Sequence, residues 1–296
     1  MFEITVLGTS GSAPTRERSM PSVAVVRDGS LYLFDCGEGT QMQMLRYGIN
    51  ISRLKAIFIS HVHGDHVIGI AGLVRSLALN NRREDLEIFV PAGSEKVVHS
   101  LVKFDNAMID YRIIIKGVET GRVFSGRDFS VSAFKLDHTV KTCGYVISEN
   151  DKIKFNKVKC RKLGIRGMMF PELLKKKKIN VNGRIVGIRS VSRIEKGKRV
   201  VYATDTRPVR NTVNAARDAD LLIHECAYEE SEIALAKERK HSASVEVARL
   251  AKSARVRMLV LTHFSARYKT TAKILKEARS IFMRTIAASD GYRIRI

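Results

Sequence analysis

The sequence predicts a mixed α/β (α+β) fold with one large hydrophobic core. A chain of 296 residues is long enough to bury such a core, and its 45% hydrophobic content excludes a disordered chain. Short apolar runs typical of β-strands recur along the whole chain, and amphipathic segments typical of helices lie between some of them. Because other strands follow one another directly in hairpins, we expect mixed sheets rather than a simple parallel series.

The chain is expected to open with a strand over residues 2–7 and a hairpin over residues 22–34. Asp28-Gly29 at the centre of the hairpin is a strong signal for a tight turn. A glycine-rich segment, residues 8–12, lies between the two elements. It contains no lysine and precedes no helix, so it predicts a plain turn rather than a phosphate-binding loop.

Strands and helices are predicted in turn for the rest of the chain. Helices are expected over residues 67–79, over residues 94–104, after Ser242 as an N-cap, and after Tyr268. Further strands are predicted at residues 56–59, 86–90, 111–116, 129–135, 144–148, 200–203, 221–223 and 257–261, and near residues 292–296.

Side chains that bind metals follow several of these strands. The densest group, residues 60–66 (SHVHGDH), places His61, His63, Asp65 and His66 directly after a buried strand. Ligands of α/β proteins gather at the carboxyl ends of strands, and neutral imidazoles with a carboxylate suit zinc. The glycine within the group lets the backbone turn, so that one cluster could serve two ions. Taken alone, the segment also fits a coincidental histidine-rich loop or a single structural metal.

Other strand ends carry the same residue types. Asp205, Glu225 and His263 each follow an apolar strand, as do Asp35 and His138. Taken singly, His138 fits a buried structural histidine, and Asp35 fits either a solvated turn residue or a partner that holds a ligand imidazole in one tautomer. The repetition of acids and histidines at strand ends indicates a shared site.

Residues 152–199 carry most of the positive charge. The chain has 52 lysines and arginines against 30 acidic residues, a net charge of +22, and this segment holds seventeen of the basic residues and two of the acids, or +15. It includes the run Lys175, Lys176, Lys177 and Lys178 beside a short apolar stretch. A charge run is usually a solvated face, but this density predicts a protruding arm that binds the phosphates of a polyanion.

The four cysteines lie far apart and form no C-x-x-C pair. This pattern gives no sign of a disulfide framework or a cysteine zinc knuckle, and reduced thiols fit the cytosol. The first residues lack a basic region and a cleavage site, and no apolar run approaches the ~18 residues of a membrane span. We therefore expect a soluble, cytoplasmic protein without a membrane partner.

Seven residues, in their order along the chain, resemble the five motifs of the metallo-β-lactamase superfamily: His61, His63, Asp65, His66, His138, Asp205 and His263. The resemblance covers nearly the whole chain and implies an αββα sandwich with a dinuclear metal site at one edge. It implies two zinc ions per subunit that share Asp205, one held by His61, His63 and His138 and the other by Asp65, His66 and His263. Manganese or iron would also suit such ligands.

The segments around these ligands resemble ribonuclease Z, the tRNA 3′-processing endonuclease, in its short form. They lie at residues 35–41 (DCGEGTQ), 60–66, 224–226 (HEC), 241–242 (HS) and 263–268 (HFSARY). The resemblance implies a zinc-dependent hydrolase that removes the 3′ trailer from precursor tRNA. Attack of metal-bound hydroxide on the phosphodiester would leave a 3′ hydroxyl on the tRNA and a 5′ phosphate on the trailer.

The family also implies roles for residues outside the ligand set. The residue equivalent to His241 protonates the leaving 3′ oxygen, and the residue equivalent to Glu225 orients it. Because a ribose alkoxide is a poor leaving group, such an acid is chemically needed. Asp65 would take the proton of the attacking water in addition to binding metal, and Ser265 and Arg267 would contact phosphate.

The basic arm lies where ribonuclease Z carries its flexible exosite, which clamps the body of the tRNA. The resemblance implies one domain over residues 1–296 with residues 152–195 as the inserted arm, in which Lys175 to Lys178 contact tRNA. It also implies a homodimer in which the arm of one subunit serves the tRNA held by the other. Two segments depart from the family: residues 167–171 (GMMFP) replace its Gly-Pro pair, and residues 14–19 (PTRERS) replace its Pro-x-Lys-x-Arg-Asn loop.

Three alternative functions fit part of this pattern. Thioester hydrolysis of the glyoxalase II kind uses a similar metal cluster, but it explains neither the basic arm nor His241. A small-molecule phosphodiesterase or arylsulfatase could use the same site. A non-catalytic nucleic-acid-binding protein accounts for the charge and leaves seven aligned ligands without a use.

Overall fold

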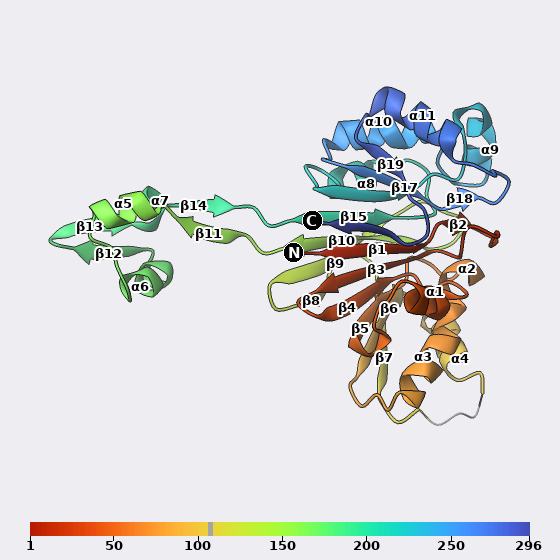
Figure 1. The fold of residues 1–296 in the computed structure, drawn as a ribbon, viewed down its shortest axis with the longest axis horizontal. Helices are drawn as coiled ribbons and strands as arrows, with labels where there is room; N and C mark the ends of the chain where they lie inside the picture. The colour runs from red at the N-terminus through yellow and green to blue at the C-terminus, as the bar shows by residue number, and fades with distance from the viewer. Residues whose placement is uncertain (106–108) are drawn as a thin grey trace. The chain divides into compact units, whose positions relative to one another are not determined.

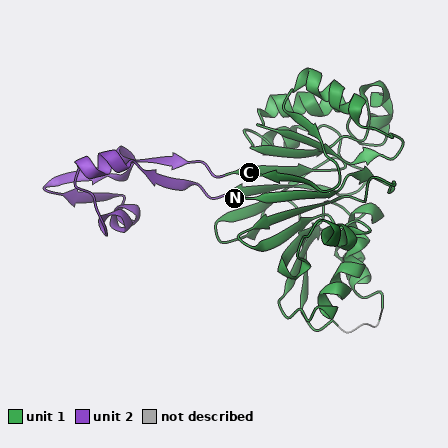
Figure 2. Ribbon diagram, in the orientation of Figure 1, with its two compact units in different colours: residues 1–148, 198–296 green, residues 149–197 purple. Residues whose placement is uncertain are grey.

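The computed structural model describes residues 1–105 and 109–296, which form two compact units. The larger unit comprises residues 1–148 and 198–296, and the smaller unit comprises residues 149–197 (Figure 2). The smaller unit therefore overlaps the basic segment 152–199 over residues 152–197. Each unit has a hydrophobic core of its own.

The first sheet of the larger unit contains seven strands (Figure 1). In order across the sheet they are β20 (Tyr292–Arg295), β1 (Glu3–Gly8), β3 (Ser22–Arg27), β4 (Ser30–Phe34), β5 (Leu54–Phe58), β6 (Leu86–Pro91) and β7 (Ile113–Val118). Strands β3 and β4 are the predicted hairpin, with Asp28 and Gly29 at φ +48° and +79° in its turn. From β4 to β7 the strands are parallel, because helices connect them.

The second sheet also contains seven strands. Their order is β19 (Thr285–Ala287), β17 (Leu259–Thr262), β16 (Leu221–Glu225), β15 (Arg199–Ala203), β10 (Cys143–Glu149), β9 (Phe129–Lys135) and β8 (Gly121–Ser125). Strands β15, β16, β17 and β19 are parallel, whereas β10 and β8 run antiparallel to β15 and β9. Strand β8 is not predicted from the sequence, because its residues are largely exposed and lack an apolar run.

The two sheets pack face to face around an aromatic core. Phe34 and Phe58 of the first sheet stack with ring centroids 4.9 Å apart and contact Tyr145 of the second. Alternate residues point to the outer faces, where helices cover each sheet (Figure 1). The helices are α1 (Thr40–Arg46), α3 (Gly69–Leu79) and α4 (Glu95–Val102) on the first sheet, and α8 (Arg210–Ala215), α10 (Ser244–Ala254) and α11 (Ala272–Ile281) on the second. The fold is the αββα sandwich that the sequence predicts.

The predicted helices are present, but Ser242 is not the N-cap of α10, and that prediction is wrong. The helix begins at Ser244, and the N–H of Ala243 donates to the Glu246 carboxylate at 3.3 Å. Ser242 instead donates its hydroxyl to the carbonyl of Thr206 at 2.6 Å and its N–H to Glu225 at 3.2 Å. A serine that looks like a helix cap therefore holds a loop of the functional site. Within the described ranges, no helix has the length and apolar character needed to cross a membrane.

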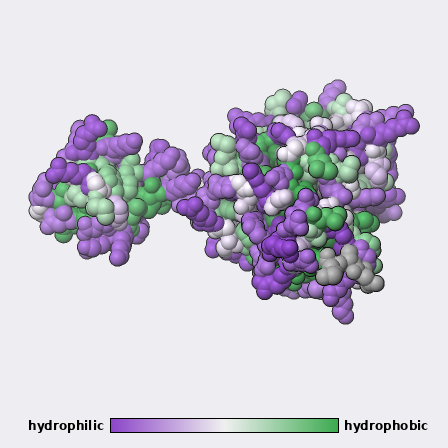
Figure 3. Space-filling model, turned by 60° about the horizontal axis from the view of Figure 1, so that its bottom comes forward, coloured by the Kyte–Doolittle hydropathy of each residue, from purple (hydrophilic) through white to green (hydrophobic). Residues whose placement is uncertain are grey.

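The smaller unit is a folded structure with mixed elements. Its outer hairpin pairs β11 (Lys152–Phe155) with β14 (Ser192–Glu195), and between these strands lie α5 (Lys157–Lys162), α6 (Met169–Lys176), β12 (Lys178–Val181), β13 (Arg184–Gly187) and α7 (Ile188–Val191). The short apolar stretch beside the lysine run is only partly internal, because Pro171 and Leu174 are exposed. Leu173 is fully buried and Phe170 packs against the core, whereas Met168 is 81% exposed. On the face seen in Figure 3, hydrophilic side chains surround a smaller apolar area.

Candidate metal centre

The predicted ligands lie where strands end at one edge of the sandwich. His61 and His63 belong to the loop after β5, and Asp65 and His66 belong to α2 (Gly64–Val67). His138 follows β9, Asp205 follows β15 and His263 follows β17. Asp205 and His263 have φ +45° and +57°, a left-handed conformation that side chains rarely adopt outside constrained sites.

Asp205 lies between two pairs of imidazoles. Its Oδ2 is 3.6 Å from Nε2 of His61 and 3.7 Å from Nε2 of His138. Its Oδ1 is 3.3 Å from Nε2 of His66 and 3.0 Å from Nε2 of His263. The two carboxylate oxygens thus face different pairs, which is the arrangement required of a ligand shared by two cations.

The remaining ligands complete the two sets. Nδ1 of His63 is 3.0 Å from Nε2 of His61, and Oδ2 of Asp65 is 3.4 Å from Nε2 of His66 and 3.7 Å from Nε2 of His263. In the part of the chain that the structure describes, ligand atoms within 4.8 Å of one another define three groups: His61, His63, His138 and Asp205; Asp65, His66 and His263; and Asp205, His241 and His263.

Two observations test whether these residues fit a pair of divalent cations. Nε2 of His66 and both ring nitrogens of His263 are buried without a hydrogen-bond partner among the described residues, a costly state that a cation would relieve. Burial alone would lower the pKa of His66, but the carboxylates of Asp205 and Asp35 raise it well above its ordinary value. A cation can replace that proton as the positive partner of Asp205, so the residues fit the metals.

Asp35 orients two of the imidazoles. Its Oδ2 accepts hydrogen bonds from Nδ1 of His66 and the hydroxyl of Ser60, both at 2.8 Å, and from the hydroxyl of Tyr202 at 2.7 Å. The Ser60 oxygen is in turn 2.9 Å from Nδ1 of His61. The hydrogen bond that the sequence suggests between Asp35 and a ligand imidazole is therefore present, and it leaves both Nε2 atoms facing Asp205.

We expect Asp35→Asn to weaken divalent-metal binding by ~10–100-fold, because an amide cannot accept all of these hydrogen bonds and fix both imidazole tautomers. Metal retained after dialysis against graded chelator concentrations measures the effect. Tyr202→Phe is the matched control, since it removes one donor to Asp35 and leaves both imidazoles in place. Equal metal retention by Asp35→Asn and the wild type would contradict the role of Asp35.

Glu225, which is buried, and His241, which is partly buried, form a pair beside the cluster. Nδ1 of His241 donates to Oε1 of Glu225 at 2.9 Å, and the carboxylate also accepts from the N–H groups of Thr206, Ala227 and Ser242 at 2.8, 3.1 and 3.2 Å. Burial would lower the pKa of His241, but the charge and hydrogen bond of Glu225 outweigh it and raise the pKa to about 9. An imidazole with this pKa carries a proton at neutral pH, and the hydrogen bond to Glu225 fixes its orientation.

His241 also contacts two predicted ligands. Its ring is stacked on that of His263 with centroids 5.6 Å apart, and it lies 5.0 Å from the ring of His138. Its proximity to Asp205 and His263 makes it geometrically compatible with a ligand as well as with an acid.

The glycine-rich segment 8–12 belongs to the site, which the sequence interpretation missed. The N–H of Ser12 donates to Oδ2 of Asp65 at 2.9 Å, and a Cβ on Gly11 would lie 2.8 Å from Nδ1 of His263. Strand β2 (Ser10–Gly11) pairs with β18 (Phe264–Ser265) and brings the segment there. The sequence predicted only a plain turn here, because glycines permit a close backbone approach without identifying the partner.

The predicted phosphate contacts are divided between the two units. Ser265 lies in β18 two residues after His263, and Arg267 forms an ion pair with Glu232 and lies 5.2 Å over the ring of Tyr228. Lys175 to Lys178 belong to the smaller unit, where they are exposed at the end of α6 and the start of β12.

Comparison with known proteins gives two family matches that follow one another along the chain. The model described as anti-Pycsar protein Apyc1 matches residues 2–158, and the β-lactamase superfamily domain matches residues 159–264.

Curated relatives match over the full length. The chain is 38% identical to ribonuclease Z of Methanosarcina acetivorans and 40% identical to ribonuclease Z of Archaeoglobus fulgidus, covering 100% of this chain and 98% of each relative. The crystal structure of human tRNase Z, short form, superposes with a TM-score of 0.74 at 25% identity and covers 99% of both chains.

Proposed function

The chain belongs to the ribonuclease Z family, and we propose that it removes the 3′ trailer from precursor tRNA. It is a hydrolase with the metallo-β-lactamase fold that acts as an endoribonuclease on tRNA. The observation that carries the proposed chemistry is the position of the Glu225–His241 pair beside two donor sets that share Asp205.

Two divalent cations are part of the proposal. His61, His63 and His138 would hold one and Asp65, His66 and His263 the other, with Asp205 shared, and zinc is the metal proposed, with manganese as the alternative. When bound, the cations supply a water of lowered pKa and positive charge for the phosphate oxygens.

The protein's own residues complete the chemistry. Burial would raise the pKa of Asp65, but the neighbouring imidazoles of His263 and His66 hold it below its usual range, so the carboxylate is ionised. We assign it the proton of the attacking water. The protonated imidazole of His241 would donate to the leaving 3′ oxygen while Glu225 keeps its Nδ1–H engaged. The products are a tRNA 3′ hydroxyl and a trailer 5′ phosphate.

Binding of the tRNA body is assigned to the smaller unit. The positive charge of its exposed lysines and arginines is complementary to a phosphate backbone. Lys175 to Lys178, at the end of helix α6 and the start of strand β12, are proposed to contact the tRNA phosphates. Ser265 and Arg267 would bind phosphate near the metals. Arg267 would leave its ion pair with Glu232 to pair with a phosphate of the substrate. We further propose a homodimer in which the smaller unit of one subunit serves tRNA held by the other.

The cytoplasm is the proposed compartment. All four cysteines are buried free thiols, a state typical of a reducing compartment. Burial raises the pKa of Cys36 to about 12 and that of Cys143 to about 11, so these thiols are unreactive and packed as apolar side chains.

Incubation of the metal-analysed protein with a precursor tRNA that carries a 3′ trailer tests the function. We expect one cut after the acceptor stem, and end mapping should give a 3′ hydroxyl on the tRNA and a 5′ phosphate on the trailer. Hydrolysis of a small phosphodiester without any cleavage of the precursor would instead assign the site to small-molecule phosphodiester hydrolysis.

A further inference from the structure

A cavity of about 530 Å³ lies in the larger unit, away from the candidate metal centre. Asp220, Met258 and Arg284 line it, and each directly precedes a strand of the second sheet: β16, β17 and β19. The cavity is therefore at the amino ends of parallel strands whose carboxyl ends carry Glu225 and His263. We call it the basic pocket because five of its lining residues are cationic: Lys198, Arg257, Arg279, Arg284 and Arg295.

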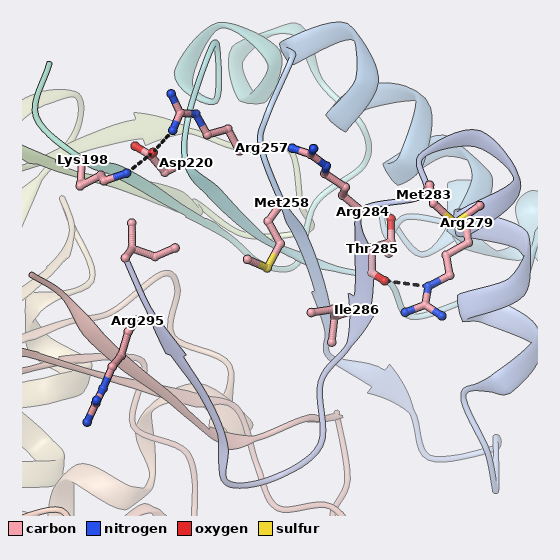
Figure 4. Close-up of a pocket in the computed structure, with 11 residues that line it drawn as sticks. Lys198, Asp220, Arg257, Met258, Arg279, Met283, Arg284, Thr285, Ile286 and Arg295 are labelled. Atoms are coloured by element: carbon pink, nitrogen blue, oxygen red, sulfur yellow. Dashed lines mark hydrogen bonds and ion pairs between the residues drawn. The ribbon is translucent and has the colours of Figure 1, made fainter.

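Only part of this charge is neutralised within the protein. Among the described residues that line the basic pocket, Asp220 has the one carboxylate side chain, and its Oδ1 lies 2.9 Å from Lys198 and 3.4 Å from Arg257. Arg295 pairs with Glu3 outside the lining at 3.4 Å. The Nε of Arg279 donates to the carbonyl of Thr285 at 2.9 Å, a bond that orients the guanidinium without neutralising it. Among the described residues, Arg284 has no ion-pair partner. In Figure 4 the guanidinium groups of Arg279 and Arg284 lie on opposite sides of Thr285, so each is a separate fork-shaped donor to an anion.

The pocket also has an apolar part. Met258, Met283 and Ile286 line it beside the cationic residues, and Met283 is 74% exposed. In Figure 4 the guanidinium groups of Arg257 and Arg284 lie on one side of the pocket, with Met258 beneath them. Its volume falls in the range of about 300–1,000 Å³ typical of small-molecule sites, which exceeds what an inorganic anion needs.

We propose that the basic pocket binds a nucleoside phosphate, with the phosphate on Arg284 and the base against Met258, which lies beneath that guanidinium in Figure 4. Arginine forks match phosphate oxygens, and flexible thioether side chains pack well against a planar base. A free nucleotide and the terminal nucleotide of an RNA strand share this chemistry. The site is separate from the metal centre and holds its ligand without reacting with it.

Calorimetric titration of the metal-loaded protein tests the proposal with three probes: AMP, a 5′-phosphorylated RNA trinucleotide and inorganic phosphate. Arg279→Gln/Arg284→Gln should weaken binding of AMP or the trinucleotide by about tenfold or more, because the variant cannot form two charge-assisted hydrogen bonds to the phosphate. The single variant Arg284→Gln, whose side chain is exposed and unpaired among the described residues, should weaken it in the same direction without risk to folding. Met258→Ser should weaken nucleotide binding and leave inorganic phosphate unaffected.

The matched control is Arg46→Gln/Lys96→Gln, which removes two exposed charges elsewhere in the larger unit. It should bind all probes as the wild type does, and all variants should hydrolyse a small phosphodiester at the wild-type rate. Binding by the trinucleotide alone would identify an RNA end as the ligand, and equal binding of AMP would show that a free nucleotide suffices. The proposal is overturned by nucleotide binding that survives Arg279→Gln/Arg284→Gln, by equal loss in the control, or by no nucleotide binding.

Discussion

Replacing residues 156–191 with Asn-Gly should lower kcat/KM for precursor tRNA by about 100-fold or more at physiological salt, while hydrolysis of a small phosphodiester changes little. The replacement removes eleven lysines and arginines and one glutamate. It also joins Phe155 to Ser192, which are register partners in the β11–β14 hairpin, through a two-residue turn suited to a hairpin. Steady-state kinetics on the two substrates measure the split.

The physical reason is that the smaller unit contains a dense group of lysines and arginines, which we propose bind phosphate. It contains none of the predicted metal ligands. It has its own core around Leu173 and Val191, so its removal leaves the cores of the larger unit intact. For every tRNA phosphate that the shortened protein no longer neutralises, the log–log salt slope of tRNA binding should fall by about 0.9, a value for duplex DNA that serves as a guide for RNA. Equal loss of both activities would show that the unit supports the larger unit's structure instead of binding tRNA.

A charge-matched pair of variants separates local binding from net charge. Replacing each of Lys175 to Lys178 with glutamine should weaken tRNA binding and make its salt dependence less steep. The control neutralises four basic residues of the larger unit that are exposed and form no ion pair among the described residues: Arg46, Lys96, Lys103 and Arg127. Similar weakening in both would indicate a general field effect rather than a docking surface.

Mixing subunits tests whether the smaller unit acts across a dimer. Subunits that lack residues 156–191 should regain cleavage of precursor tRNA when mixed dimers form with intact subunits that carry His241→Ala. In such a dimer one subunit supplies the basic unit and the other supplies the acid. Mixed dimers that remain as slow as the parent proteins would show that the smaller unit serves its own active site.

The sequence was sufficient to locate the ends of these strands and the histidines and acids that cluster after them. Apolar runs indicate strands because their side chains are buried in the core. A histidine or acid soon after such a run lies near the carboxyl end of the strand, as His138 and Asp205 do. Residues that act on the ligands from other strands carry no such local signal. Tyr202 looks like an ordinary core aromatic, yet its hydroxyl donates to Asp35 from the opposite sheet.

Backbone interactions were the least predictable part of the site. Gly11 and Ser12 reach His263 and Asp65 only because β2 pairs with β18, a pairing between segments more than 250 residues apart. Ser242 matched the local pattern of a helix cap, but its hydroxyl donates to the carbonyl of Thr206 instead. Its N–H donates to the buried Glu225 carboxylate, which would be costly to leave unsatisfied. Tertiary demands of this kind override local preference where a buried charge must be satisfied.

Replacing His241 with alanine should lower kcat for precursor tRNA by about 10²–10⁴-fold while tRNA affinity and metal content stay unchanged. The ribose 3′ oxygen would then leave without the proton that the imidazole supplies. His99→Ala is the control, because His99 is an exposed histidine on α4 outside the cluster. Elemental analysis decides the competing assignment, since His241 also lies within ligand distance of Asp205 and His263. Loss of about one metal per subunit would make His241 a ligand.

The leaving group and the pH profile isolate the acid's role. A nitrophenyl phosphodiester expels a stable anion that needs no protonation, so His241→Ala should lose far less activity on this substrate than on RNA.

In the wild type, activity on RNA should fall as pH rises through the pKa of His241, because the donor loses its proton. Burial lowers this pKa while Glu225 raises it to about 9, and Glu225→Gln removes the raising charge. The alkaline limb should therefore move to lower pH in Glu225→Gln, and an unmoved limb would show that another group supplies the proton.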